Sequence, residues 1–173
     1  MSSAIPFIFL DNEASSLTTD SYPIEIAWVR QDGSNECFLI RPEPEWTDWS
    51  EQAEALHGLS REQLMKEGHP ASEVAARFLC DVKGARLVSD APPFDRAWLE
   101  TLCGVAGKTT PVIHPVLEAW VEALRTHEGS SAQEEAALLT RVRRMEESRR
   151  KRRHRALPDA QELWRIWKDL GGR

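Results

Sequence analysis

Two carboxylates stand two residues apart where the first apolar run of the sequence ends. The run Ile5–Leu10 reads IPFIFL, and Asp11 and Glu13 follow it with Asn12 between them. Side chains at i and i+2 of a strand share one face, so the two carboxylates are predicted to lie side by side while Asn12 turns away. Adjacent anions at a partly dehydrated site need a cation, a shared proton or access to solvent. The pair therefore marks a candidate site.

Three more side chains that could join such a site lie at the ends of predicted elements. Asp95 lies in VSDAPPFDRAWL, where a predicted strand gives way to a helix near the carboxyl edge of the sheet. Asp159 lies in the first turn of the last predicted helix, and His154 precedes it by five residues in HRALPDA. Each has an ordinary explanation, because an acid in a first turn favours the helix dipole and a histidine in a basic loop is usually solvated. For Asp159 alone, capping is the better explanation.

The elements that must position these side chains form a pattern of strands followed by alternating strands and helices. The segments IEIAWVR and ECFLI, with QDGSN between them as a turn, join residues 5–10 in an antiparallel meander. Further strands are predicted in RLVS and TPVIH, which makes five. Helices are predicted at residues 50–58, 60–68, 70–81, 115–127, 132–150 and 158–170, and around a buried stripe of Phe94, Trp98 and Leu102. We expect an α/β fold with one mixed sheet and helices packed on it.

Length and composition predict a single domain without a membrane segment. With 173 residues and 41% hydrophobic content, it suits one well-buried core, so residues 1–173 are interpreted as a single domain. No apolar stretch approaches the roughly 20 residues that span a bilayer, so we expect no membrane segment. The three cysteines are far apart in the sequence, which is typical of reduced thiols and offers no metal-binding pair. A cytoplasmic location is expected.

The charge of the chain is unevenly distributed. The formal net charge is −6, yet RVRRMEESRRKRRHR, from Arg141 to Arg155, holds nine Arg or Lys residues against two glutamates. Such a run is often only a solvated helix face or a tail. It leads directly into His154, however, which would place basic side chains beside the candidate site. We interpret it as a patch that holds the phosphates of a short nucleic-acid end.

The order of these motifs resembles a known family. The pattern DxE on the first strand, FD at the start of a middle helix and HxxxxD near the end of the chain is similar to the DEDD superfamily of 3′-to-5′ exonucleases, in its histidine subtype. Softer features agree, namely Leu17 after the acidic pair, IEIA in the second strand and LHGLS after the third strand. The resemblance covers nearly the whole chain. It implies a ribonuclease H-like fold with a mixed five-stranded sheet.

The resemblance also implies a mechanism and the residues that perform it. Two divalent cations, Mg²⁺ or Mn²⁺, would be held by Asp11, Glu13, Asp95 and Asp159, whose hard oxygen atoms suit such ions. His154 would act as the general base, because an imidazole can exchange a proton near neutral pH. The expected substrate is the 3′ end of single-stranded DNA or RNA, and the products are nucleoside 5′-monophosphates. Several relatives are homodimers, so a homodimer is favoured here as well.

Other positions receive expected roles in substrate binding. Leu17 resembles the residue that wedges against the terminal base, and the amides of Ala14, Ser15 and Ser16 would approach the 3′ end, although relatives commonly carry Thr and Gly in this stretch. Arg153 and Arg155 are expected to contact phosphate. For Asp90 a turn cap is favoured over help at the metal. For Glu25 two roles stay open, orientation of a metal-bound water or a charged strand end.

Two alternatives to an exonuclease stay open. A nucleic-acid-binding or adaptor domain would keep the fold without turnover, but it has no physical reason to keep five costly polar groups together. A phosphohydrolase with Asp11 as its nucleophile would instead form a covalent phospho-aspartate. The choice between DNA and RNA stays open too, because backbone amides can read a 2′-hydroxyl.

Overall fold

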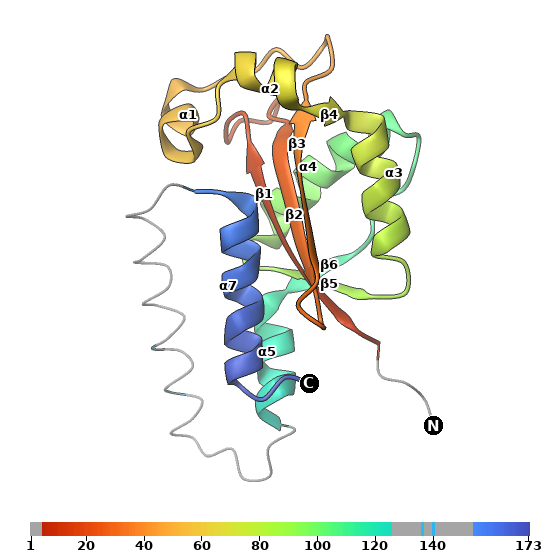
Figure 1. Cartoon of the computed structure of the whole chain (residues 1–173), viewed down its shortest axis with the longest axis vertical. Helices are drawn as coiled ribbons and strands as arrows, with labels where there is room; N and C mark the ends of the chain where they lie inside the picture. Colours follow the sequence, from red (N-terminus) through yellow and green to blue (C-terminus); the bar gives the residue numbers. More distant parts are fainter. Residues whose placement is uncertain (1–4, 126–135, 137–139, 141–153) are drawn as a thin grey trace.

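A central sheet carries helices on both faces (Figure 1). The structure, a computed structural model, describes residues 5–125, 136, 140 and 154–173. The strands are β1 Phe7–Ala14, β2 Pro23–Arg30, β3 Asn35–Arg41, β4 His69–Pro70, β5 Arg86–Ser89 and β6 Ile113–Pro115. The helices are α1 Glu51–His57, α2 Arg61–Glu67, α3 Ala71–Asp81, α4 Pro92–Val105, α5 Val116–Arg125 and α7 Ala156–Asp169. The helix predicted at 132–150 lies almost entirely outside the described residues.

The sheet is mixed, as the sequence predicted. Its strand order is β4-β3-β2-β1-β5-β6. Strands β1, β2 and β3 pair antiparallel and form the predicted meander, whereas β5 pairs parallel to both β1 and β6. The mixed α/β fold is confirmed, but the expected number of five strands is wrong because the sheet has six. The additional strand, β4, is a two-residue segment that pairs parallel to the end of β3, and so short a segment has no periodicity to detect.

Strand β1 is longer than the apolar run that predicted it. It continues to Ala14, so Asp11 and Glu13 lie inside the strand and not after it. The reason is pairing, because β2 hydrogen-bonds alongside this part of β1 and places Glu25 opposite Glu13. The register shifts between Glu13 and Ala14, which is where the chain leaves the sheet.

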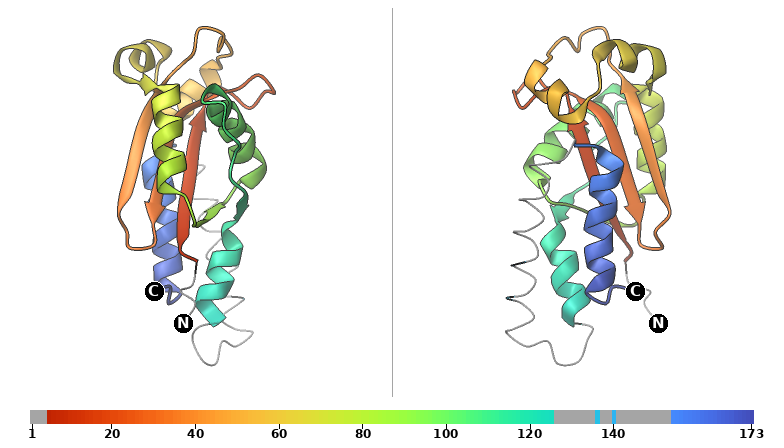
Figure 2. Two further views of the ribbon diagram at one scale, coloured as in Figure 1. Left: turned by 90° about the vertical axis from the view of Figure 1, so that its right-hand side faces the viewer. Right: turned by 60° about the vertical axis from the view of Figure 1, so that its left-hand side comes forward.

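Each face of the sheet packs against its own pair of helices (Figure 2). On one face, Phe7 and Phe9 of β1 pack in a core cluster with α5 and α7, and the ring centroid of Trp167 lies 5.5 Å from that of Phe9. On the other face, Ile8 and Leu10 pack with α3 and α4. Strand β1 is thus buried on both faces, which explains its unbroken apolar run.

One residue of the predicted stripe on α4 does not belong to the core. Trp98 and Leu102 are buried as predicted, but Phe94 is 49% exposed. Phe94 lies in the first turn of α4, and its ring centroid is 5.9 Å from that of Trp98. Helical periodicity correctly orients the side chain but does not show how far along the helix the core extends.

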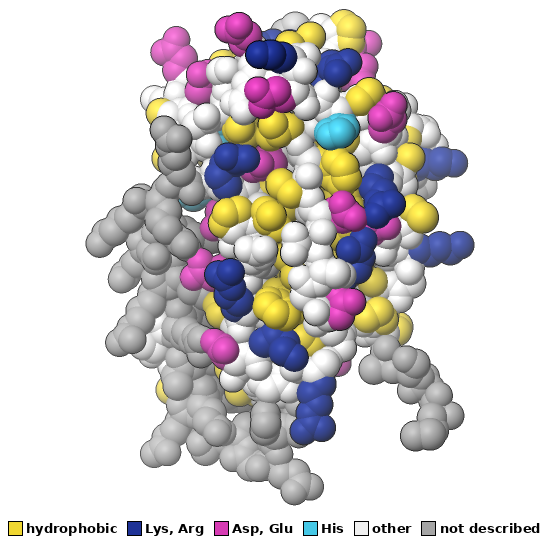
Figure 3. All heavy atoms as spheres, viewed as in Figure 1, with side chains coloured by type: hydrophobic (Ala, Val, Ile, Leu, Met, Phe, Trp, Pro, Cys, Tyr) yellow, Lys and Arg dark blue, Asp and Glu magenta, His cyan; other side chains and the backbone are white. Residues whose placement is uncertain are grey.

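Two short helices cover one end of the sheet. Ser50 caps α1, and Ser60 caps α2 through the amide of Gln63, as its capping box predicted. Gly58 ends α1 with a left-handed φ of 71°, a conformation that favours glycine. Acidic side chains gather over α1 and α2 at the top of Figure 3. No helix in the described parts of the chain is long and apolar enough to cross a membrane.

Candidate metal centre

The two carboxylates of β1 share one face, as the strand alternation predicts. Asp11 and Glu13 continue the row of Phe7 and Phe9, on the face that α7 covers. Asp11 is buried and Glu13 is half-buried. The acidic pair therefore follows directly on an apolar core, where water is scarce and charge is costly to hold without a partner.

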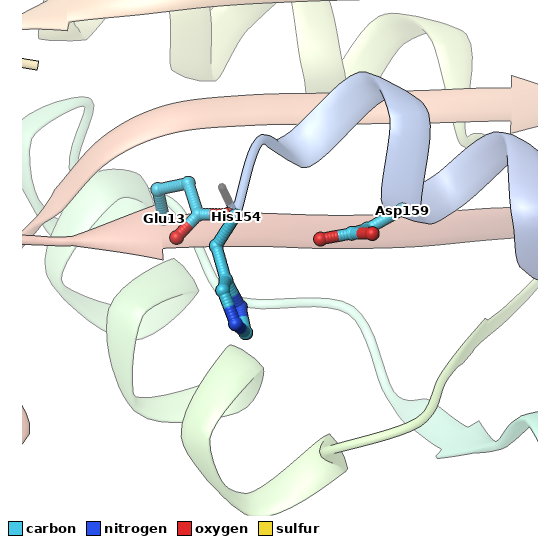
Figure 4. Close-up of side chains that lie close together, drawn as sticks. All are labelled: Glu13, His154 and Asp159. Carbon is cyan, nitrogen blue, oxygen red and sulfur yellow. The ribbon is translucent and has the colours of Figure 1, made fainter. Parts of the chain in front are cut away.

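The N-terminal turn of α7 brings two more side chains to this pair. One ligand atom from each of Glu13, His154 and Asp159 lies within 4.8 Å of the other two. In Figure 4 the carboxylate of Asp159 points from α7 toward Glu13 and His154. The His154 amide donates to the carbonyl of Leu56 at 3.1 Å, which ties this segment to the end of α1.

Asp95 completes the group from the N-terminal turn of α4. Its side chain is only 2% exposed, and its Oδ1 accepts a hydrogen bond of 2.8 Å from Asn12 Nδ2. Its Oδ2 is fully buried, as is the hydroxyl of Ser89. Burial raises the pKa of Asp95 to about 6, although hydrogen bonding from Asn12 and from the Ser89 hydroxyl acts in the opposite direction. A carboxylate whose pKa is raised by burial is the kind of group that a bound cation would stabilise.

All five predicted residues line one pocket of about 270 Å³, namely Asp11, Glu13, Asp95, His154 and Asp159. They come from β1, α4 and the start of α7, which are far apart in the sequence. Their donor atoms are carboxylate oxygens and imidazole nitrogen, a set that fits Mg²⁺ or Mn²⁺. Asp90 lines the same pocket.

The loop after β1 forms one side of the pocket. Leu17 is 75% exposed and lines the pocket with Ala14 and Ser16. Ser15 is fully buried, its amide donates to the carbonyl of Tyr22 at 3.0 Å, and it is not a lining residue. The Ser15 amide is thus occupied within the protein, whereas Leu17, Ala14 and Ser16 line the pocket, and their contacts with substrate stay a prediction.

Of the two arginines predicted to contact phosphate, the structure describes only Arg155. Arg153 lies outside the described residues, as does the basic run from 141 onward except for His154 and Arg155. The guanidinium of Arg155 forms an ion pair with Glu25, with Nη2 at 2.5 Å from Oε1. Glu25 therefore has an arginine partner, which neither of the two roles expected for it included.

Sequence reasoning missed three residues of the pocket and its support. Asn12 turns away from Asp11 as predicted, but it turns onto Asp95. His57, interpreted only as a helix end, lines the pocket. Its Nδ1 accepts a hydrogen bond from the Leu59 amide at 3.0 Å. Its Nε2 is buried and has no hydrogen-bond partner among the described residues. Burial lowers the pKa of His57, which favours a neutral ring with its proton on Nε2. Trp98, predicted as packing, also lines the pocket. No local pattern distinguishes these residues from ordinary core.

Comparison with known proteins supports the fold. No protein-family model matches the chain, and neither does any curated protein. Among solved structures, apo exonuclease I matches with a TM-score of 0.58 and 16% identity over 75% of this chain and 33% of its own. The zinc-bound E. coli exonuclease I–ssDNA complex matches with a TM-score of 0.58 and 16% identity, over 75% of this chain and 32% of its own. E. coli exonuclease I with a dA16 oligonucleotide matches with a TM-score of 0.56 and 15% identity, over 71% of this chain and 30% of its own.

These matches define the class of fold. The chain has the ribonuclease H-like α/β architecture of the nuclease domain of exonuclease I, with a mixed sheet between helices. It spans about a third of the length of these proteins. Identity at this level shows the fold alone, so activity has to be argued from the side chains of the pocket.

Proposed function

We propose that this chain is a metal-dependent 3′-to-5′ exonuclease that releases nucleoside 5′-monophosphates from single-stranded nucleic-acid ends. One observation carries the proposal, namely that the four carboxylates and the histidine expected from the sequence line a single pocket. The match to exonuclease I structures, including one with an oligonucleotide, supports the same class of substrate. Residues 1–173 would act as one exonuclease domain.

The acidic side chains would hold the metal ions. Asp11, Glu13, Asp95 and Asp159 would bind two divalent cations, and the buried Oδ2 of Asp95 offers one ligand atom. When bound, the cations would make a water molecule acidic enough to lose a proton at neutral pH and so act as the nucleophile. They would also offset charge on the phosphate and the departing 3′ oxygen. His154, beside Glu13 and Asp159, would take a proton from the attacking water.

The neighbouring residues would position the end of the strand. Leu17, exposed at the mouth, would contact the terminal base, and Trp98 would form an apolar wall. His57 Nε2 has a proton to donate to an oxygen of the nucleotide. A pocket of this size suits one terminal nucleotide and not a length of duplex.

The direct test is degradation of end-labelled oligonucleotides. Single-stranded DNA and RNA, labelled at the 3′ or the 5′ end, are incubated with Mn²⁺ or with EDTA. We expect immediate release of the 3′ label as a 5′-monophosphate, stepwise shortening of 5′-labelled strands, and no reaction in EDTA. Asp11→Asn should abolish the reaction, whereas Asp32→Asn, in the turn after β2, should not. Tight binding without shortening would favour the adaptor, and a covalent phospho-aspartate would favour the alternative hydrolase.

A further inference from the structure

Glu25 in β2 is a buried acid with several hydrogen-bond partners. Its carboxylate is 1% exposed and accepts three contacts from Arg155, two from Nε at 3.1 and 2.9 Å and one from Nη2 at 2.5 Å. It also accepts the backbone amide of Ala156 at 2.9 Å. The Cys37 thiol lies 3.7 Å from Oε1 of Glu25 and donates to it as well.

These contacts fix the segment that carries the two C-terminal site residues. Arg155 directly follows His154, and Ala156 is the first residue of α7, whose first turn contains Asp159. Arg155 is the N-cap of α7 but supplies no side-chain capping bond. Glu25 instead satisfies an amide that helix geometry leaves without a partner. With the His154 amide bound to Leu56, the segment is held from β2 on one side and from α1 on the other.

The same contacts control charge beside the pocket. Glu25 lies directly opposite Glu13 in the β1–β2 register, and directly opposed residues of antiparallel strands have neighbouring side chains. Arg155 responds to both acids, because hydrogen bonding to Glu25 and, less strongly, the charge of Glu13 raise its pKa. While the guanidinium is bound by Glu25, it is not available to pair with Glu13 and compete with a cation.

We propose that Glu25 and Arg155 form a positioning pair for the metal centre, which places His154 and Asp159 and keeps the Arg155 cation away from Glu13. In this role Arg155 does not hold substrate phosphate. The inference rests on the proposed function, because it assigns the pair to a centre that binds divalent cations.

Binding of Mn²⁺ tests the charge component without any turnover. Glu25→Gln keeps an acceptor for the Ala156 amide but releases the guanidinium, so Mn²⁺ affinity should fall by about tenfold or more as Arg155 turns to Glu13. The double variant Glu25→Gln/Arg155→Gln should recover affinity to within about threefold of the wild type, since the competing cation is gone. Calorimetric titration and the Mn²⁺ spin-resonance signal measure the Mn²⁺ affinity of the single and the double variant. Arg86→Gln, which breaks ion pairs with Glu118 and Glu122 elsewhere on the molecule, is the matched control.

The results separate this inference from the proposed function. Wild-type protein that bound no Mn²⁺ would count against the exonuclease itself. Wild-type protein that bound Mn²⁺ with the same affinity as Glu25→Gln would overturn the positioning pair alone. Each variant is first checked for cooperative thermal unfolding in EDTA. If Glu25→Gln does not fold, the kinetics of Arg155→Gln and Arg155→Lys test the positioning pair instead.

Kinetics of Arg155 variants test the positioning component. Arg155→Gln should lower kcat with little change in KM or in the salt dependence of binding. Arg155→Lys should recover little, because a lysine cannot reproduce the planar fork that binds Glu25. If instead Arg155→Gln raised KM and reduced the salt dependence, and Arg155→Lys restored both, Arg155 would be a phosphate contact and the proposal would be wrong.

Discussion

Three consecutive residues of β1 serve two sides of the candidate centre. Asp11 and Glu13 face the side covered by α7, and Asn12, between them, donates to Asp95 from α4. Because strand side chains alternate, one short stretch supplies two candidate metal ligands and the support for a third. A shift of β1 by one residue relative to β2 would exchange these faces and dissolve the site.

His154 is the residue whose replacement should separate chemistry from binding. We expect His154→Ala to lower kcat by about 10²- to 10⁴-fold, the usual contribution of a positioned general base. Mn²⁺ affinity should stay close to wild type, because the four carboxylates remain. Single-turnover assays and Mn²⁺ titration of the same preparation check both expectations.

A second histidine variant controls for general effects. His69→Ala changes an exposed residue of β4 that does not line the pocket, and it should leave kcat unchanged. Unaltered turnover in His154→Ala would remove the role assigned to that residue.

Asp95 should make the metal-free protein sensitive to pH. Its pKa is raised to about 6 in the folded state, so the folded protein keeps a proton that the unfolded chain releases near its ordinary value. The contribution of Asp95 is therefore fully favourable below about pH 4 and is lost as the pH rises through 6. Raising the pKa of Asp95 to about 6 corresponds to roughly 3 kcal/mol in the free energy of unfolding.

Asp95→Asn should remove that penalty. In EDTA at pH 7.5, roughly one and a half units above the folded-state value, we expect the variant to be more stable than wild type by about 2–3 kcal/mol. The difference should disappear toward pH 4. Denaturant unfolding across this range measures it, and a variant less stable than wild type at neutral pH would contradict the burial penalty described above.

At the scale of elements, the loop after β1 depends on one acid from a distant connection. The Asp48 carboxylate accepts the hydroxyls of Ser15, Ser16 and Thr18 at 3.0, 2.6 and 3.2 Å. Asp48 precedes α1, so it joins the loop that carries Leu17 to the helix that ends at His57. One side chain thereby holds the loop that forms the Leu17 side of the pocket.

Asp48→Ala should loosen this loop without touching the metal ligands. We expect a loss of about 1–3 kcal/mol in the free energy of unfolding, because buried hydroxyls lose a charged acceptor. KM for an oligonucleotide should rise several-fold, while Mn²⁺ affinity stays the same. Asp20→Ala, at an exposed position of the same loop, is the matched control. Equal KM values for the two variants would show that Asp48 does not organise the substrate side.

Elements were predictable where the signal is local. The meander, the capping box of α2 and the last helix follow from alternation, caps and helical spacing within a few residues. The two-residue strand β4 and the exposure of Phe94 were not predictable, because each depends on which neighbour the folded chain brings alongside.

At the scale of the whole molecule, metal binding should be visible as stability. The candidate ligands come from β1, α4 and α7, so a cation bound by all of them favours the folded state only. A concentration of Mn²⁺ one hundred times its Kd should add about 2.7 kcal/mol. That corresponds to roughly 5–10 °C in Tm for a chain of this size.

Differential scanning calorimetry with Mn²⁺ and with EDTA measures this shift. Asp95→Asn, which lacks one ligand, should show a much smaller one. An equal Tm in both conditions for the wild type, at Mn²⁺ concentrations that support turnover, would mean that the ions do not bridge the three elements.

The amino-acid sequence alone determined the class of fold, the sharing of one face of β1 by Asp11 and Glu13, and five residues that line one pocket, because these depend on short-range periodicity and on motif order. Tertiary structure alone decided the partners: Asn12 with Asp95 across 83 positions, and Arg155 with Glu25 across 130. A long-range pair leaves no local pattern, since either residue would look the same in the sequence if it were solvated. For Arg155 this difference matters most, because a basic run suggests a phosphate contact, whereas burial of Glu25 beside Glu13 requires a cation.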